Sequence, residues 1–328
     1  MSTKRRLLIA GGIGLLGAHR FSGGQSAATM RRVGMLALSS EAAAGRARAA
    51  FAQGMHDLGW LEGKNVEYRI LSAEGDVNRL DALARELVEQ KVDVIVASNT
   101  PAVRALQSAT RTIPIVMGVV GDPVGQGYVA SLAKPGGNIT GIANQGDELL
   151  AKLIQILHEV VPGAQRIAIV LNESSPPHAA YRAVAGSACA ALGLAPIWVV
   201  ASAPAELAGA VGQIVRQRAQ AVVVVGDAMY YNERVKLQTL MQTTRLPVAY
   251  GLREHVVGGG LLSYAADLVA NFRYVAKYVD KILKGAKPAE LPVEQSSRIE
   301  LVINLKTAKS LGLTIPQAVL LRADEVIQ

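Results

Sequence analysis

Short apolar runs rich in β-branched residues alternate with amphipathic segments from Arg31 to Tyr264. Such runs are typical of buried parallel strands, and the helical periodicity between them is typical of helices that cover a sheet. The pattern predicts repeated strand–helix–strand units. The expected strands fall in two rounds of five: Val33–Leu38, Val66–Leu71, Val92–Ala97, Ile113–Val119 and Ile139–Ala143, then Ile167–Leu171, Ile197–Val200, Ala221–Val225, Pro247–Tyr250 and Leu261–Tyr264.

The segments between the strands carry apolar side chains at helical spacing, and the longest such face runs from Leu268 to Leu283. Two similar rounds predict an α/β protein with two doubly wound parallel-sheet lobes joined by a hinge, with a single α/β barrel as the alternative. The change of lobe is expected near Gly141–Gly146. The expected segments are 1–28 as a signal peptide, 29–141 with about 266–290 as lobe one, and 142–265 as lobe two. Residues from about 291 to 328 are grouped with lobe two, although the sequence leaves their lobe open.

Composition excludes several classes of protein. The chain of 328 residues is 50% hydrophobic and 18% charged, whereas disorder requires low hydrophobicity and high net charge. The single cysteine, Cys189, has no intramolecular disulfide partner, and no Cys/His cluster has zinc spacing. The net charge is +8, but Lys4, Arg5, Arg6 and Arg20 all precede residue 29. No run of basic residues follows, so charge gives little support to nucleic-acid binding.

The first 28 residues have the order of a secretory signal peptide. Lys4–Arg6 is basic, Leu7–Ala18 is apolar, and Ser22–Ala28 is small and polar, with Ala28 before the expected cleavage site. The apolar run is too short to span a membrane as a helix. An alternative is a dinucleotide-binding loop, because Gly12–Gly17 matches G-x-G-x-x-G. The Gly/Ser-rich residues that follow are not a helix, which favours the signal peptide.

Polar residues follow directly after many of the predicted strands. In open α/β sheets, ligands bind beyond the carboxyl ends of the strands, so these residues are candidates for a cleft between the lobes. Thr100 is the expected N-cap of a helix with Pro101 at its first position, and such a helix start favours a carboxylate. Asp122 and Asp227 are candidates to hold an ammonium group. The predicted ligand-binding residues are Ser39, Asn99, Thr100, Asp122, Ser174, Ser175 and Asp227.

These strand-end residues have a second interpretation, because Ser, Asn, Asp and Gly are also ordinary turn and cap residues. The sequence contains no nucleophile elbow, no phosphate-binding P-loop and no metal-binding HExxH motif. His178 and His255 have no evident nucleophile beside them, and Cys189 is expected to be inert in a helix. The prediction is therefore a binding protein without catalytic residues, cofactor or metal, and the alternative is a nicotinamide-dependent oxidoreductase that uses Gly12–Gly17.

Over essentially its whole mature length, the chain resembles the substrate-binding proteins of ABC transporters of the tryptophan/tyrosine type, and two regions carry the most specific motifs. The first region is Gly121–Gly125 with Ser131–Gly141. The second consists of Gly259–Tyr264, Tyr278–Pro288, Leu291–Gln295, Glu300–Lys309, Leu311–Pro316 and Arg322–Ile327.

The resemblance implies a type I periplasmic-binding-protein fold that closes on a small molecule, in this family an aromatic amino acid where assigned. It also implies export to the periplasm, ABC permease and ATPase subunits as partners at the inner membrane, no nucleic-acid partner and no need for an oligomer. A ligand-sensing periplasmic receptor is a further alternative. A DNA regulator on the same fold would need a helix-turn-helix module before the core, where this chain has the expected signal peptide.

Overall fold

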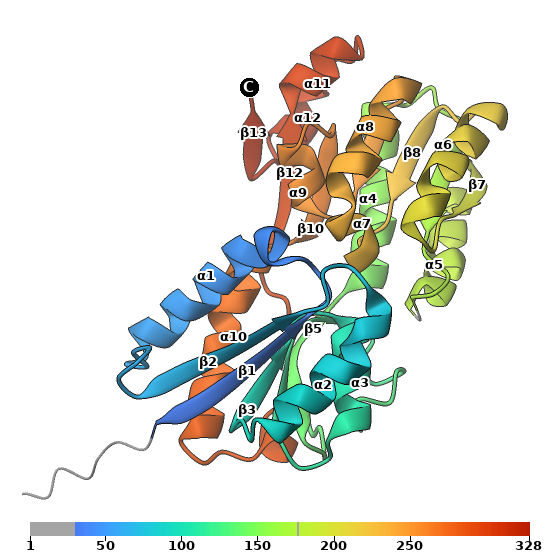
Figure 1. The fold of residues 1–328 in the computed structure, drawn as a ribbon. Coiled ribbons are helices and arrows are strands. Elements are labelled where there is room, and N and C mark those ends of the chain that lie inside the picture. Colours follow the sequence, from blue (N-terminus) through green and yellow to red (C-terminus); the bar gives the residue numbers. More distant parts are fainter. Residues whose placement is uncertain (1–29, 176) are drawn as a thin grey trace, which may run out of the picture.

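The computed structural model describes residues 30–175 and 177–328, which form two lobes that each contain one β-sheet covered by helices (Figure 1). Both sheets are built mainly of parallel strands, so the two-lobed α/β prediction is confirmed and the single barrel is wrong. The expected signal peptide and the glycine motif Gly12–Gly17 lie outside the described residues. Within the described parts of the chain, no helix combines the length and the hydropathy needed to cross a membrane.

The sheet of the first lobe has six strands. They are β1 (Arg31–Ala37), β2 (Val66–Ser72), β3 (Val94–Ala97), β4 (Ile115–Gly121), β5 (Ile139–Asn144) and β11 (Glu294–Gln295). Their order is β11-β5-β4-β3-β1-β2, and every pair is parallel. Every residue of β3 is buried because helices cover both faces of the sheet, which explains its unbroken apolar sequence.

Helices pack on both faces of this first sheet. They are α1 (Glu41–Asp57), α2 (Leu80–Glu89), α3 (Thr100–Ala109) and α10 (Leu268–Leu283), with the short 3-10 helices η1 (Val77–Arg79) and η3 (Pro288–Glu290). Phe51 of α1 and Phe272 of α10 belong to one apolar cluster, and Leu87 of α2 and Leu106 of α3 belong to the other. A side chain at Gly54 would meet the Arg273 carbonyl oxygen at 2.7 Å, so this glycine permits the close contact of α1 with α10.

The sheet of the second lobe has seven strands. They are β6 (Arg166–Leu171), β7 (Ala195–Val200), β8 (Ala221–Val224), β9 (Val248–Tyr250), β10 (Leu262–Ala266), β12 (Ile299–Asn304) and β13 (Glu325–Ile327). Their order is β13-β12-β10-β9-β8-β6-β7. The β10–β12 pair is antiparallel, whereas the sequence predicted only parallel strands in both sheets.

The helices of the second lobe enclose a single large apolar cluster. They are α4 (Gly146–Val160), α5 (Pro177–Ala191), α6 (Leu207–Arg216), α7 (Ala228–Asn232), α8 (Arg234–Thr244), α9 (Arg253–Val257), α11 (Leu305–Ser310) and α12 (Gln317–Leu320), with the 3-10 helix η2 (Pro204–Glu206). Cys189 lies fully buried in this cluster, and burial raises the pKa of its thiol to about 11, which keeps the sulfur protonated and unreactive.

The ten predicted strands are present as β1–β10, with bounds shifted by at most two residues. Beyond them, β11 pairs with β5 of the first sheet, past the expected end of the returning segment near residue 290. The next strands, β12 and β13, belong to the second sheet. The segment 291–328 is thus shared between the two sheets.

Three segments cross between the lobes: the junction of β5 with α4, the junction of β10 with α10, and residues 296–298 between β11 and β12. The side chain of Asn271 donates to Ser296 Oγ at 2.8 Å, and the backbone N–H of Ser296 donates to the carbonyl oxygen of Ala143 at 3.0 Å. The backbone N–H of Asp267 also donates to the carbonyl oxygen of Arg298 at 2.9 Å. Hydrogen bonds therefore hold the three crossings side by side as one hinge.

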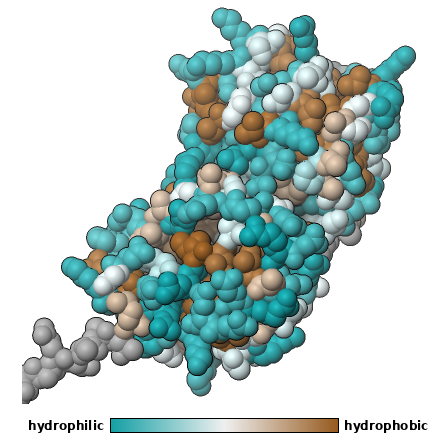
Figure 2. Space-filling model, viewed as in Figure 1, coloured by the Kyte–Doolittle hydropathy of each residue, from teal (hydrophilic) through white to brown (hydrophobic). Residues whose placement is uncertain are grey.

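Hydrophilic residues cover most of the face shown in Figure 2, and hydrophobic residues reach the surface in separate groups on each lobe. Large apolar side chains with high exposure include Val215, Val235, Val257 and Leu321. They lie on different elements of the second lobe, which is the ordinary distribution for a folded protein.

His255 on α9 is the most completely buried histidine of the described residues, with 2% of its surface exposed. Its ring stacks on Tyr250 with the ring centres 4.7 Å apart. Burial lowers the pKa of the imidazole from 6.5 to about 4. The unfolded chain therefore takes up this proton at a higher pH than the folded chain does.

We predict that His255 contributes stability that is complete above about pH 6.5 and is lost as the pH falls toward 4. The loss is at most about 1.4 kcal/mol per pH unit for one proton. His255→Phe keeps a ring against Tyr250 and should flatten the pH dependence of the free energy of unfolding across this range. Val257→Ala, an exposed and non-titrating position on the same helix, serves as the control and should keep the wild-type slope. An unchanged slope in His255→Phe would contradict the prediction.

Candidate functional site

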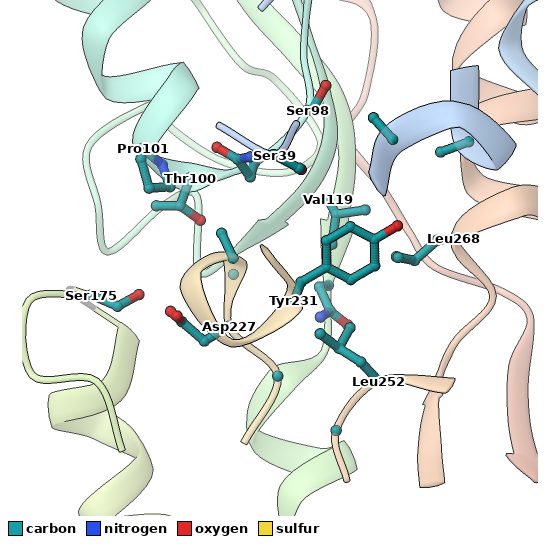
Figure 3. Close-up of a pocket in the computed structure, with 18 of the residues that line it drawn as sticks. Ser39, Ser98, Thr100, Pro101, Val119, Ser175, Asp227, Tyr231, Leu252 and Leu268 are labelled. Carbon is teal, nitrogen blue, oxygen red and sulfur yellow. The ribbon is translucent and has the colours of Figure 1, made fainter. Parts of the chain in front are cut away.

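The carboxyl ends of the parallel strands in both sheets face a cleft between the lobes, where the structure contains a cavity of about 150 Å³ (Figure 3). We call this cavity the apolar chamber. Its apolar wall is formed by Met35, Val119, Leu252, Leu268, Phe272 and the ring of Tyr231. Residues from both lobes contribute to this wall, so a ligand in the chamber would contact both lobes at once.

The start of α3 forms one polar wall of the apolar chamber. The N-cap is Asn99, whose Oδ1 accepts from the backbone N–H of Ala102 at 3.1 Å, so the prediction of Thr100 as N-cap is wrong by one residue. Both residue types cap helices well, and the sequence alone did not distinguish them. The backbone N–H of Val103 donates to the Asn99 carbonyl oxygen, and Pro101 has no N–H. The amide and hydroxyl of Thr100 are therefore the donors left for a ligand.

Asp227 forms the opposite polar wall, at the start of α7. Its carboxylate accepts from the backbone N–H of Met229 at 2.8 Å and from the side-chain amide of Asn172 at 3.0 Å. Only 9% of Asp227 is exposed, yet it lines the apolar chamber. Figure 3 shows its carboxylate and the Ser175 hydroxyl across the opening from Thr100. The hydrogen bonds fix a negative charge at this position, where it can attract an ammonium group.

A second cavity of about 270 Å³ adjoins the apolar chamber, and we call it the polar chamber. Ser174 is exposed and lines the polar chamber only. Asp122 lines neither chamber: its backbone has φ of 42°, and its carboxylate accepts from the Gly125 N–H at 2.8 Å. The structure brings the other predicted residues together around the apolar chamber, namely Ser39, Asn99, Thr100, Ser175 and Asp227.

Several residues of the apolar chamber lie within helices. They could not be found by considering only the residues that follow the carboxyl ends of strands. Arg48 projects from α1 and pairs with Glu41, while Phe272 and Leu268 come from α10. The ring of Phe272 also covers Gly118, where a Cβ would lie 2.8 Å from the ring. The sequence did show Phe272 and Leu268 on the longest amphipathic face, but that pattern indicates packing as readily as ligand contact.

Direct contacts between the lobes close the cleft beside the apolar chamber. The Tyr231 hydroxyl donates to the Ala43 carbonyl oxygen at 2.6 Å, and the backbone N–H of Ser40 donates to Asn232 Oδ1 at 3.2 Å. A Cβ at Gly75 would lie 2.2 Å from Asn232 Nδ2, so the absence of a side chain there makes room for Asn232. We call the pairs Tyr231–Ala43 and Asn232–Ser40 the lobe clasp. Burial raises the pKa of Tyr231, which keeps its hydroxyl protonated as a donor.

No cluster of three or more side chains of the metal-ligating types was found within residues 30–175 and 177–328. His178, one of the histidines considered as a base, has no described side chain. The lining of the apolar chamber combines hydrogen-bond donors, the Asp227 carboxylate and an apolar wall, a set that suits the binding of a small amphipathic molecule.

Two parallel-sheet lobes joined by three crossings, with a cleft at the carboxyl ends of their strands, define the type I periplasmic-binding-protein fold. The chain belongs to the ABC transporter substrate-binding protein family, whose model matches residues 32–327. This confirms the resemblance seen in the sequence. The family match does not favour the alternative of a nicotinamide-dependent oxidoreductase.

Individual relatives cover nearly the whole chain. The tyrosine-binding protein of Clostridioides difficile (strain R20291) is 23% identical over 283 residues, 86% of this chain and 81% of that protein. A solved domain from Streptococcus pneumonia in complex with L-Trp is 27% identical with a TM-score of 0.83, covering 91% of this chain and 100% of that chain. A conserved domain protein from Vibrio cholerae is 28% identical with a TM-score of 0.85, covering 90% and 99%.

We predict that Tyr231→Phe shifts the ligand-free protein toward an open form, because the variant lacks the hydroxyl that joins the lobes. A net hydrogen bond contributes about 0.5–1.5 kcal/mol, which changes the ratio of open to closed protein by up to about tenfold. Small-angle X-ray scattering should show a larger radius of gyration. Tyr274→Phe is the matched control, because the Tyr274 hydroxyl donates to Glu294 within the first lobe at 2.7 Å. Equal radii for wild type and Tyr231→Phe would contradict the role of the clasp.

Proposed function

We propose that this chain is the periplasmic substrate-binding component of an ABC importer, and that its ligand is an aromatic amino acid. The observation that carries the proposal is the apolar chamber, which has a fixed carboxylate from one lobe and free donors from the other at its opening. An amino acid with an aromatic side chain offers the complementary groups. The names of the relatives, which bind tyrosine and L-Trp, support the same ligand class.

In the proposed complex, the ligand's ammonium group lies against the Asp227 carboxylate. Its carboxylate accepts from the amide and hydroxyl of Thr100, with the Ser39 hydroxyl beside them. The aromatic ring lies on the wall formed by Phe272 and Leu252. Burial of an aromatic ring contributes a large apolar area, and the two charged contacts fix its orientation.

The remaining predicted residues have supporting roles in this proposal. Asn99 holds the start of α3 in place through its cap, and Ser174 and Ser175 form the wall contributed by the second lobe. Asp122 stabilises the turn that follows β4. The ligand stabilises the closed form because it contacts both lobes, and the extent of closure is limited by its differential affinity for the closed and open forms.

The transport role rests on membership of the substrate-binding family. The closed, liganded form would dock on ABC permease and ATPase subunits at the inner membrane, without catalysis by this chain and without a need for an oligomer. Substrate-binding proteins of this family are extracellular or periplasmic, and residues 1–28 supply the expected export signal. The intact mass of the exported protein tests the export step, because cleavage after Ala28 leaves Thr29 as the first residue.

We predict that Asp227→Asn weakens binding of L-tyrosine and L-tryptophan at least tenfold, measured by isothermal titration calorimetry. The substitution removes the charge that pairs with the ammonium group while keeping an oxygen that can cap α7. Asp122→Asn is the matched control, because Asp122 lines neither chamber, and its affinities should stay within about twofold of wild type.

A comparison of ligands makes the same test without altering the protein. The wild-type chain should bind L-tyrosine far more tightly than 3-(4-hydroxyphenyl)propionate, which lacks the amine, and than tyramine, which lacks the carboxylate. Equal binding of all three compounds, or binding of no aromatic amino acid by a chain with a cooperative melting curve, would overturn the proposed ligand.

A further inference from the structure

The cleft continues beyond the apolar chamber into the polar chamber. Thr100, Pro101, Ser175, Asp227 and Ala228 line both cavities, so the residues assigned to the ligand's charged groups stand between the two chambers rather than at a closed end. A single amino acid in the proposed orientation would occupy the apolar chamber and leave the polar chamber, of about 270 Å³, to solvent.

The polar chamber has walls from both lobes, and several polar side chains that do not line the apolar chamber face it. From the first lobe come Asn78, Arg104 and Tyr128, and from the second come Ser174 and Ser202. These side chains supply amide, hydroxyl and guanidinium groups, and they stand beside apolar side chains such as Leu38, Val77 and Met229. These groups can form hydrogen bonds and an ion pair with a polar extension of the ligand.

Arg104 is the cation of the polar chamber. Among the described residues no carboxylate lies within ion-pair distance of its guanidinium group. Asp76 also lines this chamber, but its Oδ1 accepts from the backbone N–H and the side-chain amide of Asn78, both at 3.0 Å. Arg104 is an exposed residue that lines this cavity, and an arginine there without an acidic partner offers a bidentate site for a carboxylate.

Arg104 lies on α3 within reach of a ligand that is longer by one amino-acid residue. Arg104 lies four residues after Thr100, about one helical turn or roughly 6 Å along the axis. One extended residue spans about 3.3–3.6 Å, and the flexible arginine side chain can cover the difference. A carboxylate displaced by one residue from the Thr100 donors therefore reaches the neighbourhood of Arg104.

We propose that the ligand class of this cleft includes dipeptides with an aromatic N-terminal residue, a proposal that rests on the proposed function above. The aromatic side chain occupies the apolar chamber, and the free N-terminal ammonium group pairs with Asp227. The peptide carbonyl oxygen takes the place of the amino acid carboxylate at Thr100. The second residue extends into the polar chamber, where its C-terminal carboxylate pairs with Arg104.

The test compares three ligands by isothermal titration calorimetry on the full chain: L-tyrosine, L-tyrosyl-L-alanine and L-tyrosyl-L-alanine amide. The amide lacks only the terminal negative charge. The dipeptide should bind at least tenfold more tightly than its amide. In Arg104→Gln this ratio should fall to about one, while the affinity for L-tyrosine stays within about twofold of wild type. Arg111→Gln, an exposed arginine just beyond the other end of α3, controls for net charge and should keep the tenfold ratio.

The outcomes separate this inference from the function on which it rests. Binding of L-tyrosine together with weak or equal binding of the dipeptide and its amide overturns the dipeptide proposal and leaves the amino acid proposal standing. A preference for the dipeptide that persists in Arg104→Gln overturns the assignment of Arg104. Failure of all three ligands to bind a protein with a normal melting curve overturns both proposals.

Discussion

The hydrogen bonds of Ser296 hold together the three chain segments that cross between the lobes, and the cleft depends on them. Ser296 joins α10 through Asn271 and joins β5 through Ala143, and all three residues are buried. Buried polar groups are costly unless they are paired, so this network favours one arrangement of the crossings. With the crossings fixed, the lobes can rotate about a defined hinge while each keeps its own half of the binding site intact.

Each lobe contributes a different kind of group to the cleft, and this division follows from the fold. The first lobe brings the start of α3 with the donors of Thr100, and the second brings the start of α7 with the carboxylate of Asp227. Neither half makes a complete site alone. In the proposed complex, a ligand that carries both an ammonium group and a carboxylate contacts both lobes and so links binding to closure. The hydrogen bonds of the lobe clasp also join the lobes beside the apolar chamber.

Much of the fold was predictable because buried parallel strands appear in the sequence as uninterrupted apolar runs. Strands such as Val94–Ala97 are apolar throughout, since helices cover both faces of the sheet. The two-residue strand β11 is not an apolar run, because both of its residues are exposed. The antiparallel pairing of β12 depends on the long return of the chain through α10, which local composition does not encode.

The site was predictable only in part, for a related reason. The rule that ligands lie beyond strand ends found Ser39, Thr100 and Asp227, which the fold brings to one cleft. It also selected Asp122, which accepts a hydrogen bond in a turn and does not line the apolar chamber. It did not select Phe272, which lines the chamber from a helix that returns from the distant end of the chain. The most direct measurement is a crystal structure of the protein with L-tyrosine. The account predicts closed lobes with the ligand's ammonium group at the Asp227 carboxylate and its ring against Phe272. Open lobes with L-tyrosine bound elsewhere, or a bound ligand with its ring turned away from Phe272, would contradict it.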